Sequence, residues 1–137
     1  MTIRHLITAS KLDYRNQHEA PDKEAGCPMH DLTSMYPDDV YTHPEYYAPR
    51  GPEKAGAAIA LKNRGKPNAR VTVYRALPKD LDLGINDGDW VTPVKAYAEL
   101  HGRSWLRDGF RIVKKVVKAR ELFTEGNSLA EWGYDPR

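Results

Sequence analysis

The chain has 137 residues, of which 40% are hydrophobic and 29% are charged, and its formal net charge at pH 7 is +2. This length predicts one domain with one modest core, and the nearly balanced charge argues against a protein that coats nucleic acid. A single cysteine, Cys27, excludes a disulfide framework and a cysteine-based zinc cluster. No apolar stretch approaches the roughly 18–20 residues that span a bilayer, so we expect a cytoplasmic protein with no membrane contact.

Residues 1–52 are polar and are interrupted by prolines, which predict turns because proline fixes φ and keeps the preceding residue out of the α region. Short helices around Tyr14 or Val40 are compatible with this pattern. The segment holds five of the eight tyrosines, namely Tyr14, Tyr36, Tyr41, Tyr46 and Tyr47. Disordered segments are poor in aromatics. We therefore expect residues 1–52 to form an ordered, loop-rich wrap that walls part of an active site.

Three histidines of this segment, His18, His30 and His43, are 12 and 13 residues apart. Such spacings suit no compact metal motif, so we predict no metal ligand among them. Cys27 lies in a turn-like context, and we assign it no chemistry.

Residues 53–137 predict a core of helices and strands. The alanine-rich residues 53–64 predict a helix that Gly65 and Pro67 terminate. Residues 70–77 alternate and are rich in β-branched side chains, which predicts a strand. A loop is expected over residues 78–88.

A second run of elements follows this loop. Residues 89–92 predict a short strand, and Thr92 and Pro93 suit the N-cap and first position of a helix over residues 94–101 that ends at Gly102. We expect, in order, a strand at 110–118, a helical turn at 119–123 and a last strand at 127–134. The whole pattern predicts an α+β fold in a single domain, residues 1–137.

Three polar residues occupy positions where chemistry is expected. Arg75 shares a strand face with valines, where a guanidinium needs a fixed anion, either a ligand or a salt bridge with a partner strand. Thr92 is either a plain helix cap or a hydroxyl at the mouth of a cleft. Glu131 lies between apolar and aromatic residues, so its carboxylate is paired, raised in pKa, at an exposed edge, or waiting for a ligand. Trp90 and Tyr97 lie near these residues in the sequence and can pack against a nicotinamide or adenine ring, although such aromatics are often core.

These residues stand in motifs with a recognisable order. They are residues 73–76 around Arg75, residues 88–93 before the predicted helix, residues 96–102 within it, and residues 127–134 around Glu131. The chain resembles the ADP-ribosyltransferase superfamily in this order, in the group whose signature is arginine, then serine or threonine, then glutamate. It is similar to small proteins of phages and bacterial mobile elements over residues 70–136.

The resemblance implies a split β-sheet with NAD, as substrate, in the cleft between its halves. Arg75 would bind the phosphates and adjacent ribose of NAD, and Thr92 would shape the nicotinamide cleft. Glu131 would be the catalytic residue, stabilising the oxocarbenium character that develops as the glycosidic bond breaks. The implied activity is NAD-dependent mono-ADP-ribosyl transfer to a macromolecular acceptor, protein or nucleic acid, by a toxin or host-modifying factor in a bacterial cytoplasm. An antitoxin or inhibitor would be a further partner.

Two departures from the family pattern bear on this implication. The complete Ser-Thr-Ser motif is absent, so packing against the nicotinamide ring would fall to Trp90 or Tyr97. Leu129 stands where arginine-modifying relatives carry a second glutamate, which argues against arginine as the acceptor. Two alternatives stay open: a non-catalytic binding module descended from this fold, and an NAD glycohydrolase with water as the acceptor.

Overall fold

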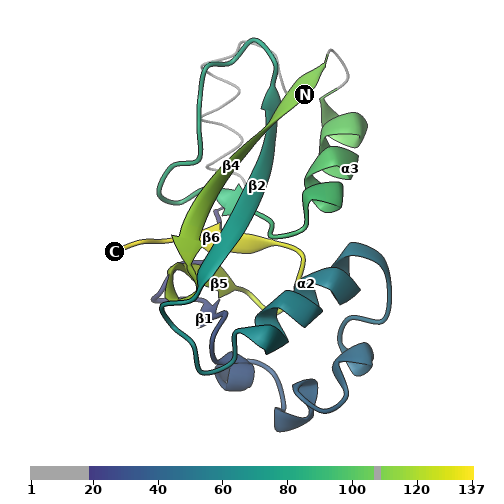
Figure 1. Ribbon diagram of the computed structural model, residues 1–137, viewed down its shortest axis with the longest axis vertical. Helices are drawn as coiled ribbons and strands as arrows, with labels where there is room; N and C mark the ends of the chain where they lie inside the picture. Colours follow the sequence, from purple (N-terminus) through teal and green to yellow (C-terminus); the bar gives the residue numbers. More distant parts are fainter. Residues whose placement is uncertain (1–18, 107–108) are drawn as a thin grey trace.

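The computed structural model describes residues 19–106 and 109–137. Within these ranges the chain is mixed α+β, with two α-helices and two antiparallel sheets (Figure 1). The helices are α2 (Gly51–Lys62) and α3 (Lys95–Trp105), and the strands are β1 (Cys27–Pro28), β2 (Arg70–Pro78), β3 (Trp90–Val91), β4 (Phe110–Lys118), β5 (Leu122–Thr124) and β6 (Trp132–Tyr134). None of the described helices has the length and apolar character needed to cross a membrane.

The two sheets differ in size and meet at one bridge. The four-stranded sheet has the order β1-β5-β6-β3, and the two-stranded sheet pairs the nine-residue strands β2 and β4. The two strands predicted at 70–77 and 110–118 are therefore confirmed. An isolated bridge joins Tyr74 of β2 to Thr92, just after β3, through two backbone hydrogen bonds of 2.7 and 3.0 Å. The bridge thus joins the middle of β2 to the chain just after the end of β3.

The N-terminal segment contributes to the core. Strand β1 pairs with β5, and the side chains of Cys27, Met29, Leu32 and Val40 are fully buried together with Trp132. Val40 ends a short 3-10 helix, as the sequence allowed. Residues 19–52 are therefore more than a wrap, because they supply apolar surface without which the four-stranded sheet would be open to solvent. The predictions for residues 1–18, including Tyr14 and His18, lie outside the described residues.

Helix α2 packs closely on the segment that leads into β6. It begins two residues earlier than predicted, at Gly51, whose φ of 59° favours glycine. Gly56 is buried, and a Cβ built there would lie 1.9 Å from the carbonyl oxygen of Leu129. The helix and this segment therefore touch backbone to backbone, which fixes the chain just before Glu131.

Helix α3 corrects two expectations from the sequence. Its N-cap is Val94, so the prediction that Thr92 caps the helix is wrong, although the Thr92 hydroxyl accepts a 3.1 Å hydrogen bond from the Val94 N–H. The helix also continues through Gly102 to Trp105. Gly102 allows close packing rather than termination, since a Cβ there would lie 2.4 Å from the Phe110 ring.

The C-terminal elements are shorter than the sequence predicted. The helical turn is a 3-10 helix of Ala119–Glu121, and the strand β5 begins at Leu122. Of the strand predicted at 127–134, only Trp132–Tyr134 pairs as β6. Residues 125–131 form a turn instead, because the Ser128 and Thr124 hydroxyls bond to nearby backbone N–H groups and replace a strand ladder.

Candidate active site

Arg75 lies on the buried face of β2 and has a carboxylate partner within the chain. Its Nη1 is 2.7 Å from Oδ2 of Asp89, and the two side chains are 14% and 1% exposed. The same Asp89 oxygen accepts a 2.8 Å hydrogen bond from the Asn86 N–H. The salt-bridge alternative for Arg75 is thus observed. Asp89 was not predicted as its partner, although a carboxylate at the start of a neighbouring short strand was available as a signal.

Thr92 and Glu131 are brought opposite each other by strand register. Strand β3 pairs with β6 so that Trp90 faces Gly133 and Val91 faces Trp132. Continuing this register by one position sets Thr92 opposite Glu131, where side chains of an antiparallel pair are neighbours. Two of the three signature residues therefore lie at the same end of this strand pair, next to the bridge to β2.

Tyr97 connects α3 to this acid. Its hydroxyl donates a 2.5 Å hydrogen bond to Oε2 of Glu131, 34 residues away in the sequence. A charge-assisted hydrogen bond of this length fixes the carboxylate in one orientation. Glu131 is half-buried, so the carboxylate is held on the protein without being sealed from a ligand.

Trp90 lies two residues before Thr92 and is half-buried. Its partner in register is Gly133, and a Cβ at that glycine would lie 1.9 Å from the carbonyl oxygen of Pro21. The backbone of the N-terminal segment therefore packs against the strand pair two register positions from Thr92 and Glu131. Only a residue without a side chain permits this approach.

His101 is a neighbour of this group that sequence reasoning did not assign. It stands four residues after Tyr97 on α3, and residues four apart share a helix face. Burial lowers the pKa of its imidazole below the ordinary 6.5; the Glu131 carboxylate opposes this shift and the Arg75 guanidinium adds to it. Both charges therefore act on this ring. The four-residue spacing from Tyr97 was the signal that could have identified it.

Four of the five predicted site residues, Trp90, Thr92, Tyr97 and Glu131, come from segments that meet at one end of the β3–β6 pair. The fifth, Arg75, lies on the neighbouring strand β2. Tyr97 is hydrogen-bonded to Glu131, Thr92 lies opposite Glu131 when the register is continued, and Trp90 is two register positions from Thr92. Arg75 is held by Asp89 and makes no ion pair with Glu131, both being described residues. Its charge nevertheless reaches His101.

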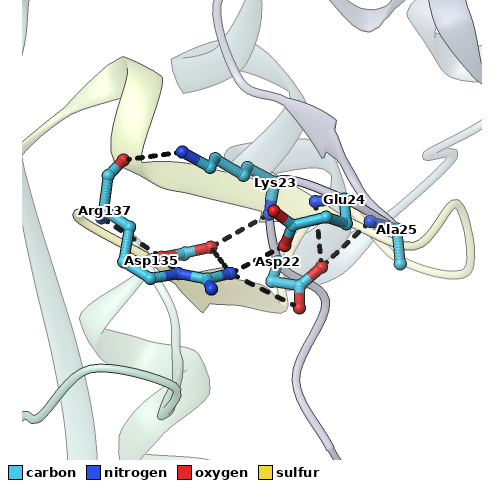
Figure 2. Close-up of polar contacts among 6 residues, drawn as sticks. All are labelled: Asp22, Lys23, Glu24, Ala25, Asp135 and Arg137. Carbon is cyan, nitrogen blue, oxygen red and sulfur yellow. Dashed lines mark hydrogen bonds and ion pairs between the residues drawn. The ribbon is translucent and has the colours of Figure 1, made fainter.

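A second polar cluster, the C-terminal cluster, consists of Asp22, Glu24, Asp135 and Arg137. Figure 2 shows the Arg137 side chain among the three carboxylates. Carboxylate oxygens of the three acids lie within 4.8 Å of one another, as in a metal site, but Arg137 already forms ion pairs with all three at 2.7–3.7 Å. A hollow of about 430 Å³ adjoins this cluster, and its lining includes none of the predicted site residues. The hollow is acidic and thus a poor match for an anionic dinucleotide.

Comparison with known protein families, with curated proteins and with solved structures found no match. The chemistry open to the site is therefore inferred from its own residues. They are an oriented carboxylate, a hydroxyl, a half-buried imidazole and a guanidinium that a carboxylate holds in place. This set suits the binding of an anionic ligand and the stabilisation of a cationic centre beside Glu131.

Proposed function

We propose that this protein is an NAD-dependent mono-ADP-ribosyltransferase with the split-sheet fold of that superfamily. It transfers ADP-ribose from NAD to a macromolecular acceptor, protein or nucleic acid, and releases nicotinamide. It acts in the cytoplasm of a bacterial cell as a toxin or host-modifying factor, and an antitoxin or inhibitor would restrain it there.

The observation that carries this proposal is the convergence of the signature residues at the junction of the two sheets. Arg75 follows the residue that is bridged to Thr92, and Thr92 stands opposite Glu131 by register. The three residues come from segments separated by 17 and 39 positions in the sequence. A random set of polar residues would not be expected to meet where two antiparallel sheets join.

The expected chemistry follows from the charges. As the bond between nicotinamide and ribose breaks, positive charge grows on the ribose carbon, and a fixed carboxylate stabilises that charge most strongly in the transition state. Glu131 is the carboxylate, and the Tyr97 hydroxyl orients it in advance. Trp90 packs against the nicotinamide ring, and the Thr92 hydroxyl lines the cleft.

In this proposal Arg75 binds the pyrophosphate of NAD, while Asp89 keeps the Arg75 guanidinium in position. A guanidinium carries five N–H donors in a planar fork, and the ion pair with Asp89 engages one terminal nitrogen. Asp89 would then set the direction of the fork, much as an outer carboxylate orients a ligand-binding group.

The same ion pair favours a second candidate, a binding module in which NAD chemistry has been lost. A guanidinium that is already paired gains less from a phosphate, because the new contact competes with Asp89. The two candidates differ in whether nicotinamide is released.

The test is incubation of the purified full-length protein with NAD labelled in the adenosine part, with and without host lysate. Release of nicotinamide together with label on a macromolecule supports transfer, and release without label supports the glycohydrolase alternative. A thermal-shift titration provides the binding measurement, with stabilisation of about 2.7 kcal/mol expected at roughly 100 times the dissociation constant. Stabilisation without nicotinamide release would support the binding module. The absence of both NAD binding and nicotinamide release would refute the proposal.

A further inference from the structure

His101 stands beside the carboxylate of Glu131 without a role in the proposed function. The Tyr97 hydroxyl bonds Glu131, so the face of α3 that bears Tyr97 is turned toward that acid. His101 is one turn further along the same face and is half-buried. Its other neighbour along this face is Trp105, whose ring centroid lies 6.3 Å from that of His101. The imidazole thus lies between the acid and the exposed end of the helix.

Transfer of ADP-ribose to any uncharged nucleophile releases a proton that a protein group has to accept. Arg75 cannot accept it, because a guanidinium stays protonated. Asp89 is 1% exposed and is paired with Arg75, and the Tyr97 hydroxyl already donates to Glu131. Glu131 is needed as an anion opposite the ribose carbon. Among the described residues around this acid, His101 is the remaining group whose neutral form can take a proton near pH 7.

We propose that His101 is the general base that accepts the proton of the attacking nucleophile, and that this nucleophile is a neutral O–H or N–H group. This inference rests on the proposed function. The bond between the ribose C1 and the nicotinamide nitrogen breaks, and its electron pair leaves with nicotinamide. A lone pair of the acceptor forms the new bond to C1, its proton passes to an imidazole nitrogen, and the imidazolium returns the proton to water.

The surroundings of His101 suit a base that is neutral before the reaction and charged after it. Burial and the Arg75 guanidinium on β2 keep the imidazole unprotonated, while the Glu131 carboxylate before β6 stabilises the imidazolium once it forms. Helix α3 also packs on β4, whose Arg111 guanidinium is occupied by the carbonyl oxygens of Leu81 and Leu83. The charged groups that act on the His101 ring are therefore Arg75, which lowers its pKa, and Glu131, which raises it.

The experiment compares nicotinamide release by the wild type, His101→Gln and Trp105→Ala in the full chain, with water and then azide as nucleophile. Azide carries no proton, so it needs no base. We expect His101→Gln to lose roughly 100-fold or more of the water reaction, as is typical when a general base is removed. Azide should restore the rate of nicotinamide release by His101→Gln and yield ADP-ribosyl azide. Trp105→Ala keeps the imidazole but loses its ring neighbour, so it should retain the water reaction.

A wild-type pH profile tests the same step without a variant. The turnover number with water should fall as pH drops below the lowered pKa of His101, because the base becomes protonated, whereas the azide reaction should lack this limb. Unchanged water turnover in His101→Gln would overturn the proposal. So would a variant that binds NAD yet is not restored by azide. A wild type that releases no nicotinamide would refute the proposed function itself, and the role of His101 with it.

Discussion

Two of the arginine–aspartate pairs among the described residues differ in their surroundings. In the C-terminal cluster, Arg137 meets both carboxylate oxygens of Asp135 at 2.9 Å and also Oε1 of Glu24 at 2.7 Å (Figure 2). In the candidate active site, Arg75 meets one oxygen of Asp89. The first guanidinium bonds to carboxylates through Nε and Nη2, whereas the second forms an ion pair with Asp89 alone among the carboxylates of the described residues.

Burial separates the two pairs further. In the first pair Asp135 is 6% exposed but its partner Arg137 is 56% exposed, whereas in the second pair both Arg75 and Asp89 are largely buried, at 14% and 1% exposed. Solvent screens the first pair, which ties the C-terminus to residues 22–24, and such pairs contribute little to stability. The second pair is largely desolvated, so loss of either partner leaves a costly unpaired charge. The density of charged residues alone therefore does not distinguish the two pairs, whereas the burial of the arginine does.

The largest contrast is expected from removing each arginine. Arg75→Ala removes the ion-pair partner of the buried Asp89 carboxylate. It should therefore destabilise the fold by about 3–5 kcal/mol, the range for breaking a buried pair. Arg137→Ala, the matched control, should lower the melting temperature far less. Chemical denaturation of both variants measures the difference. Equal destabilisation by the two would show that burial does not separate the pairs.

The double variant Arg75→Ala/Asp89→Ala sharpens this prediction. It removes both charges, so its loss of stability should be smaller than the sum of the two single losses. If Arg75 also binds the pyrophosphate of NAD, Arg75→Ala should raise the Michaelis constant for NAD per folded molecule. A fall in melting temperature with unchanged affinity would make Arg75 purely structural.

The next contrast concerns two glutamates on either side of the same turn. Glu131→Gln should keep the fold and NAD binding but lose at least roughly 100-fold in nicotinamide release, because it neutralises the charge opposite the ribose carbon. Glu125→Gln is the control, since Glu125 is exposed and contacts only Asn127 among the described residues. Nicotinamide release at the wild-type rate in Glu131→Gln would contradict the assignment.

A smaller effect is expected from the hydroxyl that orients Glu131. Tyr97→Phe removes a hydrogen bond to a charged group, worth about 1.5–3 kcal/mol, and should lower turnover by about 10- to 100-fold. The Michaelis constant for NAD should change little. Tyr46→Phe, at an exposed tyrosine, serves as the control. A Tyr97→Phe enzyme with the turnover of the wild type would indicate that the acid is oriented by other contacts.

The smallest effects are the two pH dependences of stability, which fall in different ranges. Burial lowers the pKa of His101 below 6.5, so the unfolded chain binds that proton first and stability falls as pH drops below about 6.5. The Arg137 contacts lower the pKa of Asp135 below its ordinary 3.8, so that group's contribution is present above pH 3.8 and is lost on further acidification. His101→Gln should reduce only the upper dependence, and Asp135→Asn only the lower one, to which Asp31 and Glu45 also contribute because their pKa values are lowered. Urea titrations across pH measure both, and a variant that flattens the wrong range would show that the regions are coupled.

Some of the structure could be predicted from local pattern alone. Alternation of β-branched residues was sufficient for the strands at Arg70–Pro78 and Phe110–Lys118, and alanine content with a glycine–proline stop was sufficient for the helix at Gly51–Lys62. These signals are strong because propensity and burial pattern act over many consecutive residues. Arg75 was recognisable in the same way, as a charge on an apolar face that required an anion.

The tertiary structure alone decided which groups meet. The partner of Arg75 is Asp89, the short strand β1 pairs with β5, and Gly102 continues its helix because the Phe110 ring occupies the space of a side chain. The Thr92 hydroxyl bonds Val94 without capping the helix, since Thr92 itself is paired to Tyr74. None of these contacts produces a periodic pattern in the sequence, because each joins single residues that meet only in the folded chain. His101 belongs with them: its spacing sets its helix face, but only the packing of α3 against the Glu131 segment brings that face to the acid.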